Sequence, residues 1–468
     1  MSSERRITMN SQSKKMELLG SASIPKALLA MGIPTMIGML VNAFYNLVDA
    51  YFVGGLGESQ MGAISVVYPL GQVVVGLGLL FGNGAASYIS RLLGRGDKEN
   101  ADKVASTALY SSVSVGAVII IISMAFLHPI LKLLGATDSI LPYAATYAGI
   151  YIVSCIFNVF NVTMNNIVTS EGAAKTTMCA LLTGAVLNIA LDPLFIYVLD
   201  LGVAGAAIAT AISQVVSTCV YLTYILRKKS VFHFRIKDCT YTKEILSEIF
   251  KIGIPTLVFQ ILTSVSISLI NNAAGGYGDS AIAGMGVVTR LISMGSLSVF
   301  GFIKGFQPIA GYSYGAKKFD RLREAIKTSI LWSTVFCVVF GLVLALFPAV
   351  IVSQFTKGDT EMIRIGAASL RANGFSIMLF GFYTVYSSLF LALGKGREGF
   401  ILGACRQGIC FIPVILLLPM VWGLNGILYA QPIADVLSAI ITVFMAIPLH
   451  RKLNEMQKQT AAISTNNN

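Results

Sequence analysis

The chain has 468 residues, of which 55% are hydrophobic and only 12% are charged, and its mean hydropathy is +0.75. A soluble protein carries about 25% charged residues, so this composition excludes a water-soluble globular fold. The formal net charge of +12 comes from basic residues between apolar segments, which indicates membrane topology and does not indicate nucleic-acid binding.

The apolar residues fall into blocks of about twenty, the length at which a helix crosses a bilayer. The first block runs past Asp49 and lacks a cleavage pattern, so we expect a retained helix and not a signal peptide. We therefore predict an all-α polytopic membrane protein with twelve transmembrane helices. In chain order the blocks are 27–50, 61–84, 104–126, 142–165, 177–199, 203–226, 247–271, 282–306, 328–351, 369–392, 400–420 and 426–449.

The positions of Lys and Arg predict the orientation. Of the 34 such residues, 27 lie in the two terminal tails and the even-numbered loops, whereas the opposite side holds only Lys132, Lys357 and Arg364. Basic residues concentrate on the cytoplasmic side of membrane proteins, so we expect both termini in the cytoplasm.

The sequence repeats internally with an offset of 221 residues. "GIPT" at 32–35 recurs at 253–256, and Gly202 and Gly205 correspond to Gly423 and Gly426. Likewise "VGGLG" corresponds to "AGGYG", and "LGRGDKEN" to "YGAKKFDR". Because six blocks separate the copies, both copies have the same orientation in the membrane, as in a parallel repeat about an axis along the membrane normal.

The repeat predicts two pseudo-symmetric lobes of six helices each, facing a central cleft. The predicted divisions are an N-terminal tail 1–26, an N-lobe 27–226, a linker 227–250, a C-lobe 251–449 and a C-terminal tail 450–468.

An acidic residue, Asp192, lies inside the fifth block, where a carboxylate is costly without a partner or a function. Asn188 is four residues earlier and shares its helix face. Pro193 lacks an N–H, so the carbonyl of Ile189 should lose its helical partner. Thr210 lies at the same depth across the turn between two helices. These oxygen ligands suit a small cation, and the carboxylate also suits a proton.

A second acid, Asp49, lies near the outer end of the first block, with Tyr45 and Asn46 on its helix face. Each acid alone could instead be a buried, hydrogen-bonded structural group. The C-lobe equivalents of Asp49, Asn188, Asp192 and Thr210 are not acidic, so we place the ion site in the N-lobe; they are Ile270, Ile409, Pro413 and Gln431.

Four longer stretches, together with the 6+6 layout, resemble the multidrug and toxic compound extrusion (MATE) family, in its bacterial branch of drug/sodium-or-proton antiporters. They are "GIPTMIGMLVNAFYNLVDAYFVGGLG", "LLGRGDKENA", "TSEGAAK" and "LNIALDPLFI". The resemblance implies export of bulky, often cationic and aromatic compounds by alternating access, powered by Na⁺ or H⁺ entry. It also implies a multi-pass protein of the bacterial cytoplasmic membrane.

The family's N-lobe cation site corresponds to Asp49, Asn188, Asp192 and Thr210, which would be the Na⁺ ligands in a sodium-coupled protein. Tyr45 and Tyr147 correspond to its supporting tyrosines. We expect no cofactor beyond the coupling ion, small-molecule drugs or organic cations as substrates, and a monomer in the bilayer.

Other charged residues also lie in apolar blocks, among them Asp435, Arg290 and Lys304. Asp435 could pack structurally or contact substrate, and Arg290 and Lys304 could line the cleft or pair with acids. Alternatives to drug antiport are a flippase of lipid-linked saccharides, which would want a basic cleft, and an exporter of one specific metabolite. We do not expect an enzyme, because the sequence shows no nucleophile–base set, zinc spacing or phosphate-binding loop.

Overall fold

The computed structural model describes residues 3–356 and 359–466, so Lys357 and the two ends of the predicted tails lie outside the described residues. Every regular element in this part of the chain is helical, and twelve helices are long and apolar enough to cross a membrane. Each predicted block lies on one of them, which confirms the fold class. The ninth block runs past the end of its helix into the short helix that begins at Pro348.

The six spans of the N-lobe are α2 (Ile24–Gly54), α3 (Glu58–Arg95), α4 (Lys98–Ala125), α6 (Leu141–Ser170), α7 (Ala174–Pro193) continued by η1 (Leu194–Val198), and α8 (Gly202–Leu226). Those of the C-lobe are α9 (Lys243–Gly275), α10 (Asp279–Gly315), α11 (Phe319–Leu346), α13 (Thr360–Ser376) continued by η3 (Ile377–Leu379) and α14 (Phe380–Ala392), α15 (Gly396–Ala404) continued by η4 (Cys405–Ile409) and α16 (Phe411–Trp422), and α17 (Leu424–Asn466). Shorter elements are α1 (Ser3–Gly20), α5 (Leu127–Leu133), η2 (Ile236–Asp238) and α12 (Pro348–Ser353).

Several helices extend beyond their apolar blocks. α9 begins at Lys243, where the hydroxyl of Thr242 accepts a hydrogen bond from the backbone N–H of Ile245 and caps the helix. The predicted linker therefore already contains the first turns of this helix. Hydropathy marks only the part of a helix that suits the bilayer core, so at ends such as this one it places the helix boundary too far inward.

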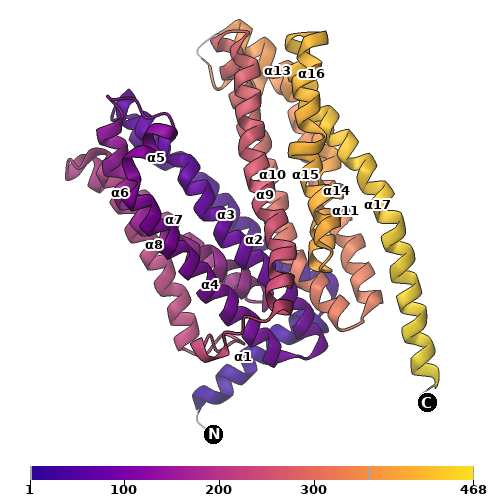
Figure 1. The fold of residues 1–468 in the computed structure, drawn as a ribbon. Coiled ribbons are helices and arrows are strands. Elements are labelled where there is room, and N and C mark those ends of the chain that lie inside the picture. Colours follow the sequence, from indigo (N-terminus) through magenta and orange to yellow (C-terminus); the bar gives the residue numbers. More distant parts are fainter. Residues whose placement is uncertain (1–2, 357–358, 467–468) are drawn as a thin grey trace.

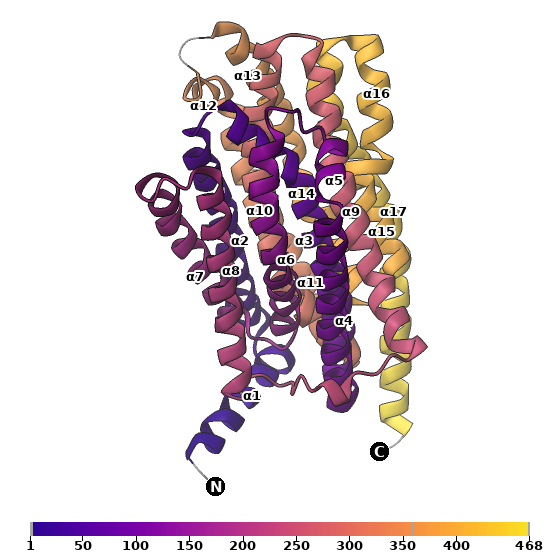
Figure 2. The same ribbon diagram turned by 60° about the vertical axis from the view of Figure 1, so that its left-hand side comes forward.

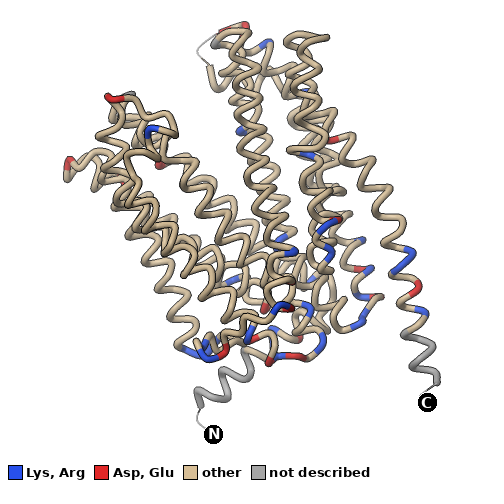
Figure 3. Tube along the Cα trace, viewed as in Figure 1, with Lys and Arg blue, Asp and Glu red and all other residues tan. Residues whose placement is uncertain are grey.

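The two lobes form a V in the view of Figure 1, and Figure 2 shows the same helices turned by 60° about the vertical axis. The lobes meet near the end of the molecule that carries both termini and diverge towards the opposite end. At the closed end, α2 packs on α10, and α3 packs on both α9 and α10. Figure 3 shows that most Lys and Arg residues gather at this closed end, the side that the sequence assigns to the cytoplasm.

Glycines at the closed end show that the repeat is also a symmetry of the structure. A Cβ on Gly94 of α3 would overlap the carbonyl of Tyr312 on α10, and a Cβ on Gly315 of α10 would overlap the carbonyl of Arg91 on α3. The offset of 221 residues converts the first contact into the second. The two lobes are thus related by a pseudo-two-fold axis that passes between α3 and α10.

Polar contacts join the lobes in the same region. Arg91 Nη2 lies 2.6 Å from Glu248 Oε2, and Thr35 Oγ1 donates to the carbonyl of Gly301 at 2.6 Å. Asn83 Nδ2 donates to Thr256 Oγ1 at 2.9 Å. Close backbone packing and these polar contacts together close this end of the molecule.

The N-terminal helix α1, which hydropathy does not predict, contacts both lobes. Lys15 Nζ lies 3.3 Å from the fully buried Glu171 of the N-lobe and also donates to the hydroxyl of Tyr224. Burial lowers the pKa of Lys15, and the carboxylate of Glu171 opposes that shift. On the C-lobe, the guanidinium of Arg321 donates to the carbonyls of Leu18, Leu19 and Ala22, in α1 and directly after it. α1 thus bridges the lobes across the closed end.

Candidate functional site

The structure brings three of the predicted ion ligands together in the N-lobe. Asp192, at the end of α7, is fully buried, and Asn188 is almost fully buried one turn before it. Asn188 Nδ2 lies 3.3 Å from Asp192 Oδ1 and 3.5 Å from Thr210 Oγ1 on the neighbouring helix α8. These long contacts hold the amide between the two side chains.

Asp49 joins this group from α2, because its carboxyl lies within hydrogen-bonding range of that of Asp192. Tyr45 and Tyr147 lie within electrostatic range of Asp49, and Tyr147 stacks on Tyr151 with ring centroids 5.6 Å apart. Asn46, in contrast, is exposed and donates to the carbonyl of Asn42 at 2.7 Å. It is therefore not part of the group.

Three oxygens of this group are buried without a hydrogen-bond partner among the described residues: Asp49 Oδ1, Asn188 Oδ1 and Asp192 Oδ2. No described Lys or Arg forms an ion pair with either acid. Two neighbouring carboxylates repel each other when both are ionised, and buried acceptors without a partner are costly. A proton or a small cation bound here would relieve both costs.

The candidate ligands of this group are all oxygen atoms. Among the described residues, no group of three or more acidic, histidine or cysteine side chains occurs that could hold a metal ion. Two carboxylates, one amide oxygen and one hydroxyl are hard oxygen ligands of the kind that alkali and alkaline-earth ions prefer. Together with the burial of Asp192, this set suits Na⁺ or H⁺.

Pro193 marks a change of helix type next to the acids. The α-helical part of the fifth span ends at Pro193, and a π-helical turn follows from Leu194 to Val198, with Leu199 N donating to the carbonyl of Leu194 at 2.9 Å. In this turn the hydroxyl of Tyr197 donates to the carbonyl of Phe52 on α2. The turn thus connects α7 to the helix that carries Asp49. The release of the Ile189 carbonyl stays a prediction.

Asp435, which the sequence leaves between packing and substrate contact, is a member of a buried ion pair. Its Oδ1 lies 2.9 Å from Arg406 Nε and accepts from Gln431 Nε2 at 2.9 Å, and its Oδ2 accepts from Ser376 Oγ at 2.9 Å. Sequence spacing relates Asp435 only to Gln431. The arginine that neutralises it lies 29 residues away on another helix.

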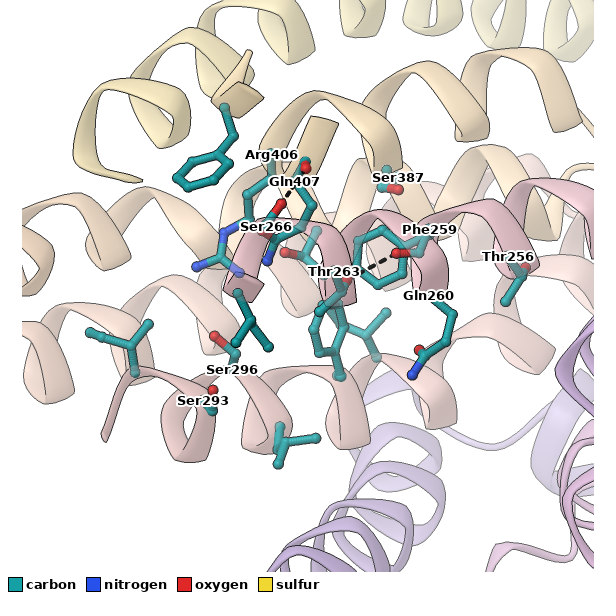
Figure 4. Close-up of a pocket in the computed structure, with 18 of the residues that line it drawn as sticks. Thr256, Phe259, Gln260, Thr263, Ser266, Ser293, Ser296, Ser387, Arg406 and Gln407 are labelled. Carbon is teal, nitrogen blue, oxygen red and sulfur yellow. Dashed lines mark hydrogen bonds between the residues drawn. The ribbon is translucent and has the colours of Figure 1, made fainter. Parts of the chain in front are cut away.

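A cavity of about 560 Å³ lies between the lobes, with most of its wall in the C-lobe. Its polar wall includes Gln260, Thr263 and Ser266 of α9 and Arg406 and Gln407 of η4 (Figure 4). Lys304 of α10 also lines it, whereas Arg290 of the same helix is exposed and lies outside the lining. Neither Asp435 nor the N-lobe acids belong to the wall.

The sequence analysis missed Arg406 and the polar face of α9. Gln260, Thr263 and Ser266 follow one another at spacings of three residues, which places them on adjacent positions of one helix face. This spacing of polar residues already indicates in the sequence that one face of the helix is polar.

Comparisons with known proteins agree with the repeat and with the fold. The MatE family model matches twice, at residues 34–194 and 255–417. The multidrug export protein MepA of Staphylococcus aureus (strain MSSA476) is 32% identical over 92% of this chain and 94% of its own length, and MepA of Staphylococcus saprophyticus is also 32% identical, over 92% and 95%.

Two solved structures show how far the likeness extends. One is described as the outward-facing conformation of a multidrug resistance MATE family transporter of the MOP superfamily; it has a TM-score of 0.89, 27% identity, and coverage of 95% of this chain and 99% of that chain. The other is a MOP superfamily transporter from Pyrococcus furiosus whose pocket of reverse polarity is said to suggest a different function, with a TM-score of 0.87 at the same identity and coverage. Family match, relatives and structures agree with the sequence motifs: the chain belongs to the MATE family of membrane transporters.

Proposed function

We propose that the protein is a secondary active efflux transporter that exports bulky organic compounds by alternating access, in exchange for entering H⁺ or Na⁺. The observation that carries this proposal is the pair of neighbouring carboxylates, Asp49 and Asp192, with buried oxygens that lack partners among the described residues. The named multidrug export relatives support the transport of drugs.

The ion site and the substrate cavity are separate, so coupling requires that each biases the same movement. Asp49 lies on α2, and α2 packs on α10, which lines the cavity. Ion binding at Asp49 and Asp192 would alter the packing of α2 and α7 next to the π-helical turn. By linkage, an ion that weakens bound substrate must itself be weakened by substrate to the same extent.

The energy available from the ion is sufficient for export without ATP. One charge that crosses 100 mV releases about 2.3 kcal/mol, which supports a concentration ratio of roughly fifty-fold. A modest ion gradient adds to this ratio.

We further propose that both termini and the closed end face the cytoplasm of a bacterial cell, and that the V is the outward-open state of a monomer. The concentration of Lys and Arg at the closed end supports this orientation (Figure 3). The substrate would then leave through the divergent end of the V.

A flippase of lipid-linked saccharides is the second candidate, and the observation that favours it is a cavity wall with Lys304 and Arg406 but no described acidic residue. An exporter of one specific metabolite is a third reading of the same fold.

Transport by purified protein in liposomes tests the proposal. A Na⁺ gradient and a pH gradient are imposed separately, and the movement of a fluorescent compound is followed. We expect one of the two gradients to drive the compound uphill in the wild type and to lose its effect in Asp192→Asn. Transport of a lipid-linked saccharide without either gradient would instead favour the flippase.

A further inference from the structure

The charges in the wall of the central cavity all have the same sign. Among the described lining residues, the charged side chains are Lys304 and Arg406, and none is acidic. The rest of the wall combines amides and hydroxyls with apolar and aromatic groups. A compound in the cavity therefore meets positive charge and neutral polar groups.

Lys304 has no counter-ion in the part of the chain that the structure describes. Its Nζ donates to the side-chain oxygen of Asn165, on α6 of the N-lobe, and no described acid pairs with it. An ammonium group in such surroundings is stabilised far better by an anion than by one neutral amide.

Part of the guanidinium group of Arg406 has no hydrogen-bond partner among the described residues. Its Nε is satisfied by Asp435, and the group lies over the ring of Phe380, with Cζ 4.6 Å from the ring centroid. The arginine side chain is only 6% exposed, and neither Nη atom has a hydrogen-bond partner among the described residues. Asp435 is not a lining residue. The pair thus neutralises Arg406 from outside the cavity and leaves donors inside it.

We propose that this cavity binds amphipathic organic anions, compounds that combine an apolar or aromatic body with an acidic group such as a sulfonate or carboxylate. The inference rests on the proposed transport function and specifies its substrate class. The acidic group accepts hydrogen bonds from Lys304 and Arg406, and the body packs on Phe259, Phe300 and the aliphatic wall. The organic cations that the family resemblance implies meet like charge at the same place.

Two dyes that share the rhodamine fluorophore but differ in net charge isolate the effect of charge on binding. Sulforhodamine B is a net anion, the ethyl ester of rhodamine B is a cation, and neither titrates near neutral pH. We expect the purified wild-type protein in detergent to bind sulforhodamine B on the order of tenfold more tightly, as measured by fluorescence anisotropy, because hydrogen bonds between charged groups are the strong ones. Equal or tighter binding of the cationic ester would overturn the inference.

Variants of Lys304 test whether the cavity wall causes the preference for the anionic dye. Lys304→Met should weaken sulforhodamine B on the order of tenfold without weakening the ester, and Lys304→Arg, which keeps the charge, should retain the preference. Lys132→Met is the matched control, because Lys132 is exposed at the other end of the N-lobe and should bind both dyes like the wild type. An unchanged dye preference in a folded Lys304→Met protein would contradict the role of this residue.

Two further experiments are needed. The first distinguishes lipid-linked acids from free acidic compounds, and the second distinguishes failure of the anion inference from failure of the proposed antiport. Displacement of bound sulforhodamine B by a polyprenyl diphosphate would show that lipid-linked acids reach the site, and its failure would restrict the site to free compounds. In liposomes, gradient-driven transport of the ester but not of sulforhodamine B would overturn the anion inference and leave antiport intact. Lys304-dependent binding of sulforhodamine B without any gradient-driven transport would support the anion inference and contradict antiport.

Discussion

At the scale of single residues, we propose that Asp49 and Asp192 of the N-lobe bind the coupling ion. Asp192→Asn is nearly isosteric, so the fold should persist, but the amide cannot take up a proton or neutralise Na⁺. We expect stabilisation of the purified protein by Na⁺ or by acid to disappear, as measured by thermal unfolding in detergent. Asn46→Ala is the control, because Asn46 lies close to Asp49 in sequence but bonds Asn42. Undiminished ion-dependent stabilisation in Asp192→Asn would contradict the site.

The ion pair of the C-lobe makes a different prediction at this scale, because it contributes to folding. Asp435→Asn leaves the guanidinium of Arg406 buried without a counter-ion, which should lower the free energy of unfolding by about 3–5 kcal/mol. The double variant Arg406→Met/Asp435→Asn removes both charges and should recover most of this loss. Chemical denaturation in detergent measures both values. A double variant no more stable than the single one would show that the pair is not the cause.

Sequence spacing predicted the proximity of three members of the proposed ion site and could not predict the position of the fourth. The sequence allows the proximity of Asn188, Asp192 and Thr210 to be predicted, because helix periodicity and one tight turn relate their positions. The proximity of Asp49 to Asp192 depends on how α2 packs on α7, and the pairing of Arg406 with Asp435 depends on how η4 packs on α17. Such contacts between distant segments leave no local pattern.

At the scale of elements, the π-helical turn after Pro193 is the irregular part of the fifth span. Pro193→Ala restores an N–H that can donate to the carbonyl of Ile189 and continue the α-helix. We expect a protein at least as stable as the wild type, with weaker ion binding and slower transport. Hydrogen exchange across 189–199 reports the repaired helix, and ion titration reports the affinity. A repaired helix with unchanged ion affinity would show that the irregular turn is incidental.

The crossing of α3 and α10 tests the closed end. A methyl group at Gly94 or Gly315 would overlap backbone of the opposite lobe, so Gly94→Ala and Gly315→Ala should push the lobes apart there. Spin labels on α4 and α11 should then show longer distances across the closed end. Gly286→Ala on α10 is the matched control, since nothing lies within 4 Å of its added Cβ. Distances unchanged in all three variants would rule out this crossing as the closing contact.

Hydropathy predicted all twelve spanning helices because a bilayer requires long apolar segments. It did not predict α1, a polar helix that is held by contacts to Glu171, Tyr224 and Arg321. These contacts come from both lobes, so the position of α1 depends on residues that are distant from it in sequence.

At the scale of the whole molecule, the offset of 221 residues in the sequence predicted the two lobes and their common orientation. The reciprocal contacts of Gly94 and Gly315 show that the symmetry is kept at the closed end. The polar side chains depart from this symmetry. Asp49 and Asp192, whose carboxyl oxygens lack partners among the described residues, belong to the N-lobe, and most of the cavity wall belongs to the C-lobe. The cavity itself was not predictable, since it arises from the angle at which the lobes pack.

Antiport requires that ion and substrate oppose each other through the two lobes, and equilibrium binding tests this opposition most directly. The affinity of the purified protein for whichever rhodamine dye it binds more tightly is measured while Na⁺ and pH are varied separately. We predict that affinity falls as Na⁺ rises, or as pH falls in a proton-coupled protein, and that Asp192→Asn removes most of this dependence. Dye affinity that is indifferent to both ions in the wild type would contradict coupling between the ion site and the cavity.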